Sequence, residues 1–124
     1  MECGAIMVFP FCVQDMTFTQ CGSGVYADKT KGRLINCVIT QCDFSGILCH
    51  ENALIALEGI QTKVDGNVTS GNSCCYGLST YNTSSIIHLL FPLTKESVSI
   101  NNCGERNYGG GGMIETVESF EKLM

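Results

Sequence analysis

The sequence predicts an all-β fold, a short single-stranded right-handed parallel β-helix of about four to five turns with a C-terminal helical cap. Three observations lead to this prediction. The stretch "TQCGSG" at residues 19–24 returns as "TQCDFSG" at 40–46, short segments alternate apolar and polar residues, and glycine-rich stretches separate these segments. Because 124 residues suit one domain, we expect a single β-helix domain over residues 1–124.

The first two turns carry the clearest repeat. At equivalent places, "VQDMTFTQC" presents Val13, Met16, Phe18 and Cys21, and "LINCVITQC" presents Leu34, Cys37, Ile39 and Cys42. The alternation predicts strands whose apolar side chains point inward and whose threonines point outward. A repeat period of about 20 to 50 residues is typical of a solenoid, so we expect each strand to pair with its equivalent one turn later.

Two weaker copies, "GIQTKVDGN" and "KESVSINNC", extend the column that closes each repeat. This column reads Cys21, Cys42, Asn67 and Cys103, with spacings of 21, 25 and 36 residues. We expect these side chains to stack as a ladder at one corner, where the Asn67 amide can bond to backbone groups. The turns are expected near residues 13–33, 34–58, 59–94 and 95–115.

A second column consists of a glycine followed by an apolar residue. It contains Gly24 with Val25, Gly46 with Ile47, Gly77 with Leu78, and Gly112 with Met113. The N-terminal "ECGAIMV" resembles the second half of a turn with Gly4 in this column, so the chain is expected to begin inside a turn and to offer open strand edges. Right-handed winding is the strong default for parallel strands joined in this way.

The last residues predict a helix. "ETVESFEKLM" places Val117, Phe120 and Leu123 at helical spacing behind a glycine run. Residues 115–124 are therefore expected to form the C-terminal amphipathic cap of the coil.

The pattern in "LINCVITQCDFSGI" resembles the right-handed parallel β-helix repeats of the pectin-lyase-like superfamily. The likeness is particularly to the asparagine-rich repeats of copper-maturation and F-box β-helix proteins, with cysteine here where asparagine often stands. It covers roughly residues 3–115 and is weakest across the long insert at 68–96. Many functions share this fold, so the resemblance implies architecture rather than activity.

Charge and cysteine content limit the partners and the compartment. The net charge is −5 and the seven Lys and Arg residues are scattered, so we expect neither nucleic acid nor a membrane as a partner. The apolar run "GAIMVFPFCV" follows Glu2 and contains Pro10, which indicates a core strand rather than a signal peptide or an anchor. Nine cysteines, an odd number, indicate reduced thiols in the cytoplasm that fill the core.

The sequence predicts no catalytic residue. A polysaccharide lyase or hydrolase, as the resemblance allows, would need clustered carboxylates, and a glycosidase needs two of them within about 5 to 10 Å. The best pairs are Asp65 with Glu58 and Asp15 with Asp43, yet no Asp doublet stands on a strand. Solvated surface carboxylates are the simpler interpretation.

No metal and no cofactor are expected either. The sequence has no C-x-x-C motif, and its nearest groupings are the vicinal Cys74 and Cys75, the pair Cys49 and His50, and the isolated His88. Core packing of the thiols is favoured over metal ligation. For Cys–His catalysis, an exposed Cys74 or Cys75 would have to lie beside a histidine.

The third turn is long and carries the candidate binding surface. Its ligand or interface candidates are Tyr76, Tyr81, His88, Ile87, Leu89 and Phe91. In one interpretation Ile87, Leu89 and Phe91 form an exposed apolar strip. In the other, the run "IIHLLFPL" forms an extra buried strand.

These features favour a non-catalytic interaction or structural protein that self-associates, with a homo-oligomer or a capping protein as its partner. A carbohydrate-binding module is one alternative, with Tyr76, Tyr81, Asn101 and Asn102 contacting an oligosaccharide. A degenerate polysaccharide lyase or hydrolase is the other.

Overall fold

The computed structural model describes residues 5–7 and 9–118, and almost all of its regular structure is β-strand. The strands of the described residues form three sheets. Sheet A contains β1 (Ala5–Met7), β4 (Val25–Asp28), β7 (Ile47–His50), β10 (Leu78–Thr80) and β13 (Tyr108–Gly110). Sheet B contains β2 (Phe11–Gln14), β5 (Lys31–Ile35), β8 (Leu54–Glu58), β11 (Ile86–Leu90) and β14 (Met113–Val117). Sheet C contains β3 (Thr17–Thr19), β6 (Val38–Thr40), β9 (Lys63–Asp65) and β12 (Ser99–Ile100).

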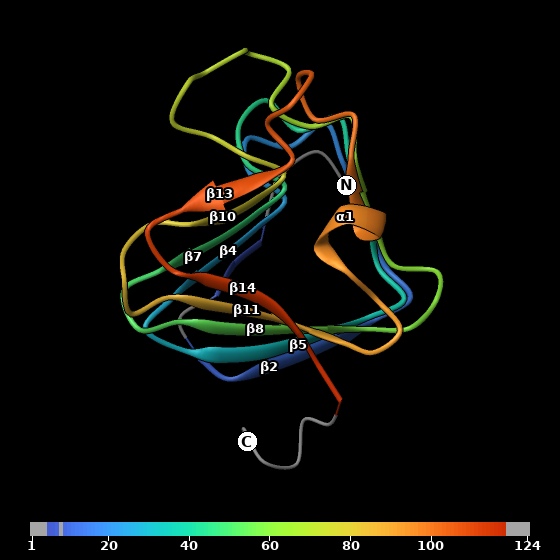
Figure 1. Ribbon diagram of the computed structural model, residues 1–124, viewed down its shortest axis with the longest axis vertical. Helices are drawn as coiled ribbons and strands as arrows, with labels where there is room; N and C mark the ends of the chain where they lie inside the picture. Colours follow the sequence, from blue (N-terminus) through green and yellow to red (C-terminus); the bar gives the residue numbers. More distant parts are fainter. Residues whose placement is uncertain (1–4, 8, 119–124) are drawn as a thin grey trace.

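The chain visits the three sheets in turn, so it forms a coil of parallel strands. Neighbours within each sheet are three strands apart in the chain order, and every strand pair among the described residues is parallel. Figure 1 shows sheets A and B as two layers, each of which runs through the colours of the sequence in the same order. The predicted all-β fold with parallel strands one turn apart is therefore confirmed.

Alternation along each strand builds the core inside the coil. The inward side chains are stacked in columns, such as Leu34, Leu57 and Leu89 in sheet B, Phe18, Ile39 and Val64 in sheet C, and Val25, Ile47 and Leu78 in sheet A. All of these are buried, with at most 2% of their surface exposed. The period of two along each strand is what places them on one face, as the sequence predicts.

The glycine column is confirmed for three of its four predicted members. Gly24, Gly46 and Gly77 each precede a strand of sheet A, and the pairing of Ala5 with Val25 puts the N-terminal segment in the same register. A Cβ atom on Gly46 would lie 2.8 Å from the carbonyl oxygen of Gly77, so neighbouring turns leave no room for a side chain there. Gly112 was wrongly placed in this column, because Leu78 pairs with Tyr108 and the position after Gly77 therefore belongs to Asn107.

The corner ladder is confirmed for Cys21, Cys42 and Asn67, which are buried, but Cys103 was wrong. Ser99 pairs with Val64, so the residue that stacks on Asn67 is Asn102, which is fully buried, while Cys103 is exposed. The sequence prediction aligned this turn with the preceding one at a register one residue away from the observed pairing. A slip of one residue moves every side chain of a strand to the opposite face, so the error reverses inside and outside for this turn.

The helical cap was wrong for Glu115–Val117, which lie in β14, and for Glu118, which follows in a bend; residues 119–124 lie outside the described residues. The described residues contain one helix, α1 (Lys95–Val98). Its N-terminus has a capping box, in which the Thr94 hydroxyl accepts from the backbone N–H of Ser97 and the Ser97 hydroxyl accepts from that of Thr94. Nothing in this described region is long and apolar enough for a membrane-spanning helix.

Helix α1 lies at the last turn of the coil, where sheets A and B have a fifth strand and sheet C, within the described residues, has four. The Lys95 ammonium lies 4.9 Å from the ring centre of Tyr108 and donates to the carbonyl oxygen of Ile114. Val98 is buried in the core. In Figure 1, α1 lies to the right of the labelled strands of sheets A and B.

Candidate functional site

The predicted apolar strip does not exist as an exposed surface. Ile87 and Leu89 are fully buried because β11 lies between β8 and β14 and points both side chains into the core. Phe91 follows the strand and is 68% exposed. The interpretation of "IIHLLFPL" as an extra buried strand is therefore correct for residues 86–90.

His88 points to the outer side of sheet B, where it is nevertheless 97% buried by its neighbours, with 3% of its surface exposed. Its Nε2 atom lies 3.2 Å from Oε1 of Glu115, and among the described residues its Nδ1 atom has no hydrogen-bond partner. Leu54 and Ala56 form a small apolar cluster on this outer face, joined by Ile86, Leu90 and Val117. His88 is thus part of a packed sheet surface and is separate from the other predicted site residues.

The two tyrosines of the prediction lie at opposite ends of β10. Tyr76 is half-buried, with the Arg106 guanidinium 4.6 Å from its ring centre, and Arg106 also donates to the carbonyl oxygen of Cys75. Tyr81 is 67% exposed. Asn102, offered as a sugar contact, is buried in the ladder, so the predicted group of Tyr76, Tyr81 and Asn102 is not brought together.

The structure instead brings Tyr81 to a group at the corner between sheets A and B. We call this group the corner cluster; its members are Tyr26, Asp28, Lys29, His50, Glu51 and Tyr81. Asp28 and His50 are register partners at the ends of β4 and β7. Lys29 and Glu51 follow them with positive φ angles of 56° and 44°, in the left-handed conformation that turns the chain toward sheet B.

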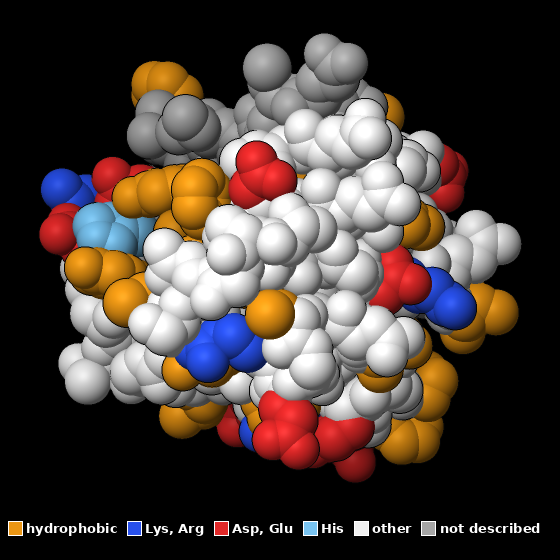
Figure 2. Space-filling view, turned by 90° about the horizontal axis from the view of Figure 1, so that it is seen from above, with side chains coloured by type: hydrophobic (Ala, Val, Ile, Leu, Met, Phe, Trp, Pro, Cys, Tyr) orange, Lys and Arg blue, Asp and Glu red, His pale blue; other side chains and the backbone are white. Residues whose placement is uncertain are grey.

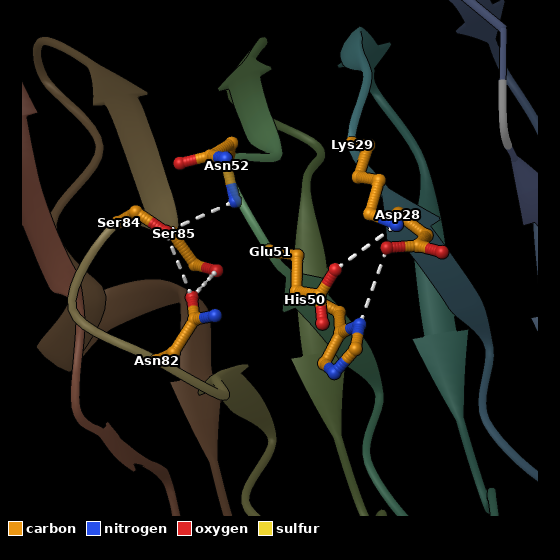
Figure 3. A network of polar contacts seen from close by, with 8 residues as sticks. All are labelled: Asp28, Lys29, His50, Glu51, Asn52, Asn82, Ser84 and Ser85. Carbon is orange, nitrogen blue, oxygen red and sulfur yellow. Dashed lines mark hydrogen bonds and ion pairs between the residues drawn. The ribbon is translucent and has the colours of Figure 1, made fainter.

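Two polar side-chain contacts cross between neighbouring turns in the corner cluster. Nδ1 of His50 lies 3.2 Å from Oδ1 of Asp28, and Nζ of Lys29 lies 3.1 Å from Oε2 of Glu51. Figure 3 shows the Asp28 carboxylate and the His50 ring facing each other, with Glu51 on the same side. One ligand atom from each of Asp28, His50 and Glu51 lies within 4.8 Å of the others, so these three side chains are able to hold a metal ion.

Two aromatic rings lie near the imidazole of His50. The ring centres of His50 and Tyr81 are 4.9 Å apart, those of His50 and Tyr26 are 5.9 Å apart, and both pairs are tilted. Burial raises the pKa of Tyr26, and the charges of Asp28 and Glu51 raise it further. The hydrogen bond to Glu51 raises the pKa of Lys29. The cluster therefore combines negative charge, an oriented imidazole and an exposed aromatic face.

The loop that presents Tyr81 is tied to the same corner. The backbone N–H of Asn52 donates to the Ser84 hydroxyl at 3.1 Å, and the hydroxyls of Ser84 and Ser85 donate to Oδ1 of Asn82 at 3.1 and 2.8 Å. Figure 3 shows this chain of contacts beside the His50 pair. It holds residues 81–85 against the corner between β7 and β8.

Sequence reasoning paired His50 with its neighbour Cys49 and missed Asp28 and Glu51. Cys49 faces the core and is fully buried, so it points away from His50. A usable signal was present: Gly24 and Gly46 are 22 residues apart, and the same offset places Asp28 beside His50.

The cysteines of the described residues are free thiols, and four of these eight, Cys21, Cys37, Cys42 and Cys49, fill the core. Burial raises the pKa of Cys42 to about 11 and that of Cys49 to about 12, which keeps both thiols neutral. Cys74 is exposed and Cys75 is half-buried, and the described partners of His50 and His88 are Asp28 and Glu115. The structure therefore gives no pairing of an exposed thiol with an imidazole among the described residues.

On the face shown in Figure 2, acidic and basic side chains form small groups separated by uncharged surface. The comparisons with protein-family models, with curated proteins and with solved structures found no match for this chain.

Proposed function

We propose that this protein is a right-handed β-helix of the pectin-lyase-like kind that acts as a non-catalytic interaction protein and associates with copies of itself through the turn formed by β1 to β3. The observation that carries this proposal is the partial exposure of the sheet B core column at that turn, although Phe18 of the sheet C column is buried there. Val13 is half-exposed, whereas Leu34, Leu57 and Leu89, which follow it in the same column of sheet B, are fully buried. Right-handed winding is the usual hand for such connections.

Two exposed apolar side chains lie at this turn. Phe9 is 77% exposed and Met16 is 38% exposed, on either side of β2. Among the described residues, β2 and β3 each pair on one side only, with β5 and β6. A second copy, turned by a two-fold axis, can bury these side chains and pair with the same edge, which gives a closed dimer rather than a fibre.

Sedimentation equilibrium over a series of protein concentrations tests the proposal. We expect a dimer or larger species for the reduced protein, and a monomer for the variant Phe9→Glu with Met16→Lys, because charges at a buried interface are costly. Ile60→Glu is the matched control, since Ile60 is 82% exposed in the turn between β8 and β9. A monomer at every concentration, or equal dissociation of the control, would contradict the proposal.

A second candidate function is carbohydrate binding at the corner cluster. The exposed ring of Tyr81 beside the carboxylates of Asp28 and Glu51 supports it, because sugar recognition combines an aromatic platform with groups that accept hydrogen bonds from hydroxyls. Titration with neutral and acidic oligosaccharides is the test. Binding should be lost in Tyr81→Ala and retained in Phe91→Ala, a second exposed aromatic residue at the end of β11.

A further inference from the structure

We infer that Asp28, His50 and Glu51 form a site for a divalent transition metal ion such as zinc. The sequence alone suggested no such site, and the inference does not depend on self-association or on carbohydrate binding. A ring nitrogen of His50 and one carboxylate oxygen each from Asp28 and Glu51 already lie within 4.8 Å of one another, and Nδ1 is 3.2 Å from Asp28. The three residues come from two successive turns of the coil, and the pairing of β4 with β7 fixes their register.

The donor set suits zinc better than the harder ions. One imidazole nitrogen and two carboxylate oxygens are ordinary zinc ligands, and three protein ligands leave a fourth position for water. Zinc ligands at about 2.0–2.2 Å from the ion lie roughly 3.4 Å from each other. The side chains must therefore close in by about 1 Å, and their partial exposure, 30% for Asp28, 23% for His50 and 43% for Glu51, leaves them free to do so.

The site is also organised before any ion binds. His50 already directs Nδ1 at Asp28, and the rings of Tyr26 and Tyr81 pack near the imidazole. Figure 3 shows the three donor groups on the same side of the corner. Asp28 and His50 lie at the ends of the paired strands β4 and β7, which give them a rigid support, and Glu51 follows His50 directly in the turn.

Lys29 already places a positive charge at this point. Its ammonium group lies 3.1 Å from Glu51 and its side chain is 66% exposed, so a metal ion can displace it into solvent. Lys29 is therefore expected to compete with the metal. This leads to an unusual expectation: Lys29→Met should bind zinc up to about fivefold more tightly than the wild type, since an exposed ion pair is weak.

The first measurement follows the two histidines of the chain by imidazole nitrogen NMR while zinc chloride is added to the reduced protein. We expect the Nδ1 resonance of His50 to shift to a metal-bound value, with His88 unchanged as an internal reference. This readout reports the histidine directly, so zinc bound to exposed thiols elsewhere does not imitate it. Calcium chloride should produce no shift of Nδ1, because calcium prefers oxygen ligands.

Variants complete the test, with folding checked by circular dichroism. Asp28→Asn and Glu51→Gln should each weaken the zinc-dependent shift of His50 by at least about tenfold in affinity. Asp65→Asn, which removes the same charge from sheet C, should leave it unchanged. The inference is overturned if His50 does not respond to zinc, or if the affinity is the same in Asp28→Asn and Glu51→Gln as in the wild type.

Discussion

One corner of the coil is built from thiols in its first two turns and from amides in the next two. Cys21 and Cys42 occupy the position after β3 and β6, and Asn67 and Asn102 occupy it after β9 and β12. All four side chains are buried. Either a thiol or an amide side chain therefore fits this corner position, and the two kinds of side chain make different contacts.

The amides connect successive turns. Oδ1 of Asn67 accepts from the backbone N–H of Cys42 at 3.0 Å, and Nδ2 donates to the carbonyl oxygen of Ile39 at 3.0 Å. Asn102 repeats the arrangement one turn later: its Oδ1 accepts from the backbone N–H of Asn67 at 2.9 Å, and its Nδ2 donates to the carbonyl oxygen of Val64 at 3.1 Å. Each amide therefore bonds to backbone groups of the preceding turn that would otherwise be buried without this hydrogen-bond partner.

The thiols make weaker contacts, within their own turn and, for Cys42, also with the backbone and thiol of Cys21 in the preceding turn. Sγ of Cys21 lies 3.6 Å from the carbonyl oxygen of Thr19, and Sγ of Cys42 lies 3.8 Å from that of Thr40. A thiol is a weak donor and packs as a small apolar group. A cysteine at this corner therefore fills space and joins successive turns only weakly, whereas an asparagine joins them through stronger amide hydrogen bonds.

Asn67→Ala should give the largest loss of stability among the variants of this corner. It leaves the N–H of Cys42 and the carbonyl of Ile39 buried without the amide, and each such group costs about 1–3 kcal/mol. We expect the free energy of unfolding in urea to fall by about 2–5 kcal/mol. The matched variant Cys42→Ala should cost only about 1 kcal/mol, the loss of a small packed group. Equal losses for the two variants would show that amide and thiol play the same role.

Of the buried thiols and amides, only the thiols titrate at alkaline pH. Burial raises the pKa of Cys42 to about 11 and that of Cys49 to about 12 from an ordinary value of 9.0. The unfolded chain ionises these thiols first, so their contribution to stability is complete below pH 9.0 and is lost as the pH rises through 11. Urea unfolding should show a loss of about 2–4 kcal/mol between about pH 8 and about pH 10.5.

The double variant Cys42→Ala with Cys49→Ala is the control for this pH dependence. It removes both raised pKa values, so its stability should change much less over the same pH interval. An unchanged pH profile in the double variant would place the titrating groups elsewhere.

Cys42→Asn tests whether an amide can replace a thiol at this corner, and it should change the stability least. The new amide occupies the position that Asn67 holds one turn later, so it can make the same cross-turn contacts with the turn of β3. We expect the free energy of unfolding to stay within about 1 kcal/mol of the wild type. A loss as large as that of Asn67→Ala would mean that the first turns are too tightly packed for an amide.

The sequence by itself determined the all-β class, the inward columns and the first three members of the ladder. Strand alternation has a period of two, and nearly identical neighbours such as "TQC" at 19–21 and 40–42 align without ambiguity. The glycines before β4, β7 and β10 were equally predictable, because their close contact with the next turn admits no side chain.

The tertiary structure alone decided three matters. It placed Asn102 rather than Cys103 in the ladder, since a one-residue difference in register exchanges the two faces of a strand. It buried Ile87 and Leu89, since an apolar strand is exposed or buried according to whether neighbours flank it. It also assembled Asp28 with His50, because residues 22 positions apart become neighbours only when two turns of the coil pair.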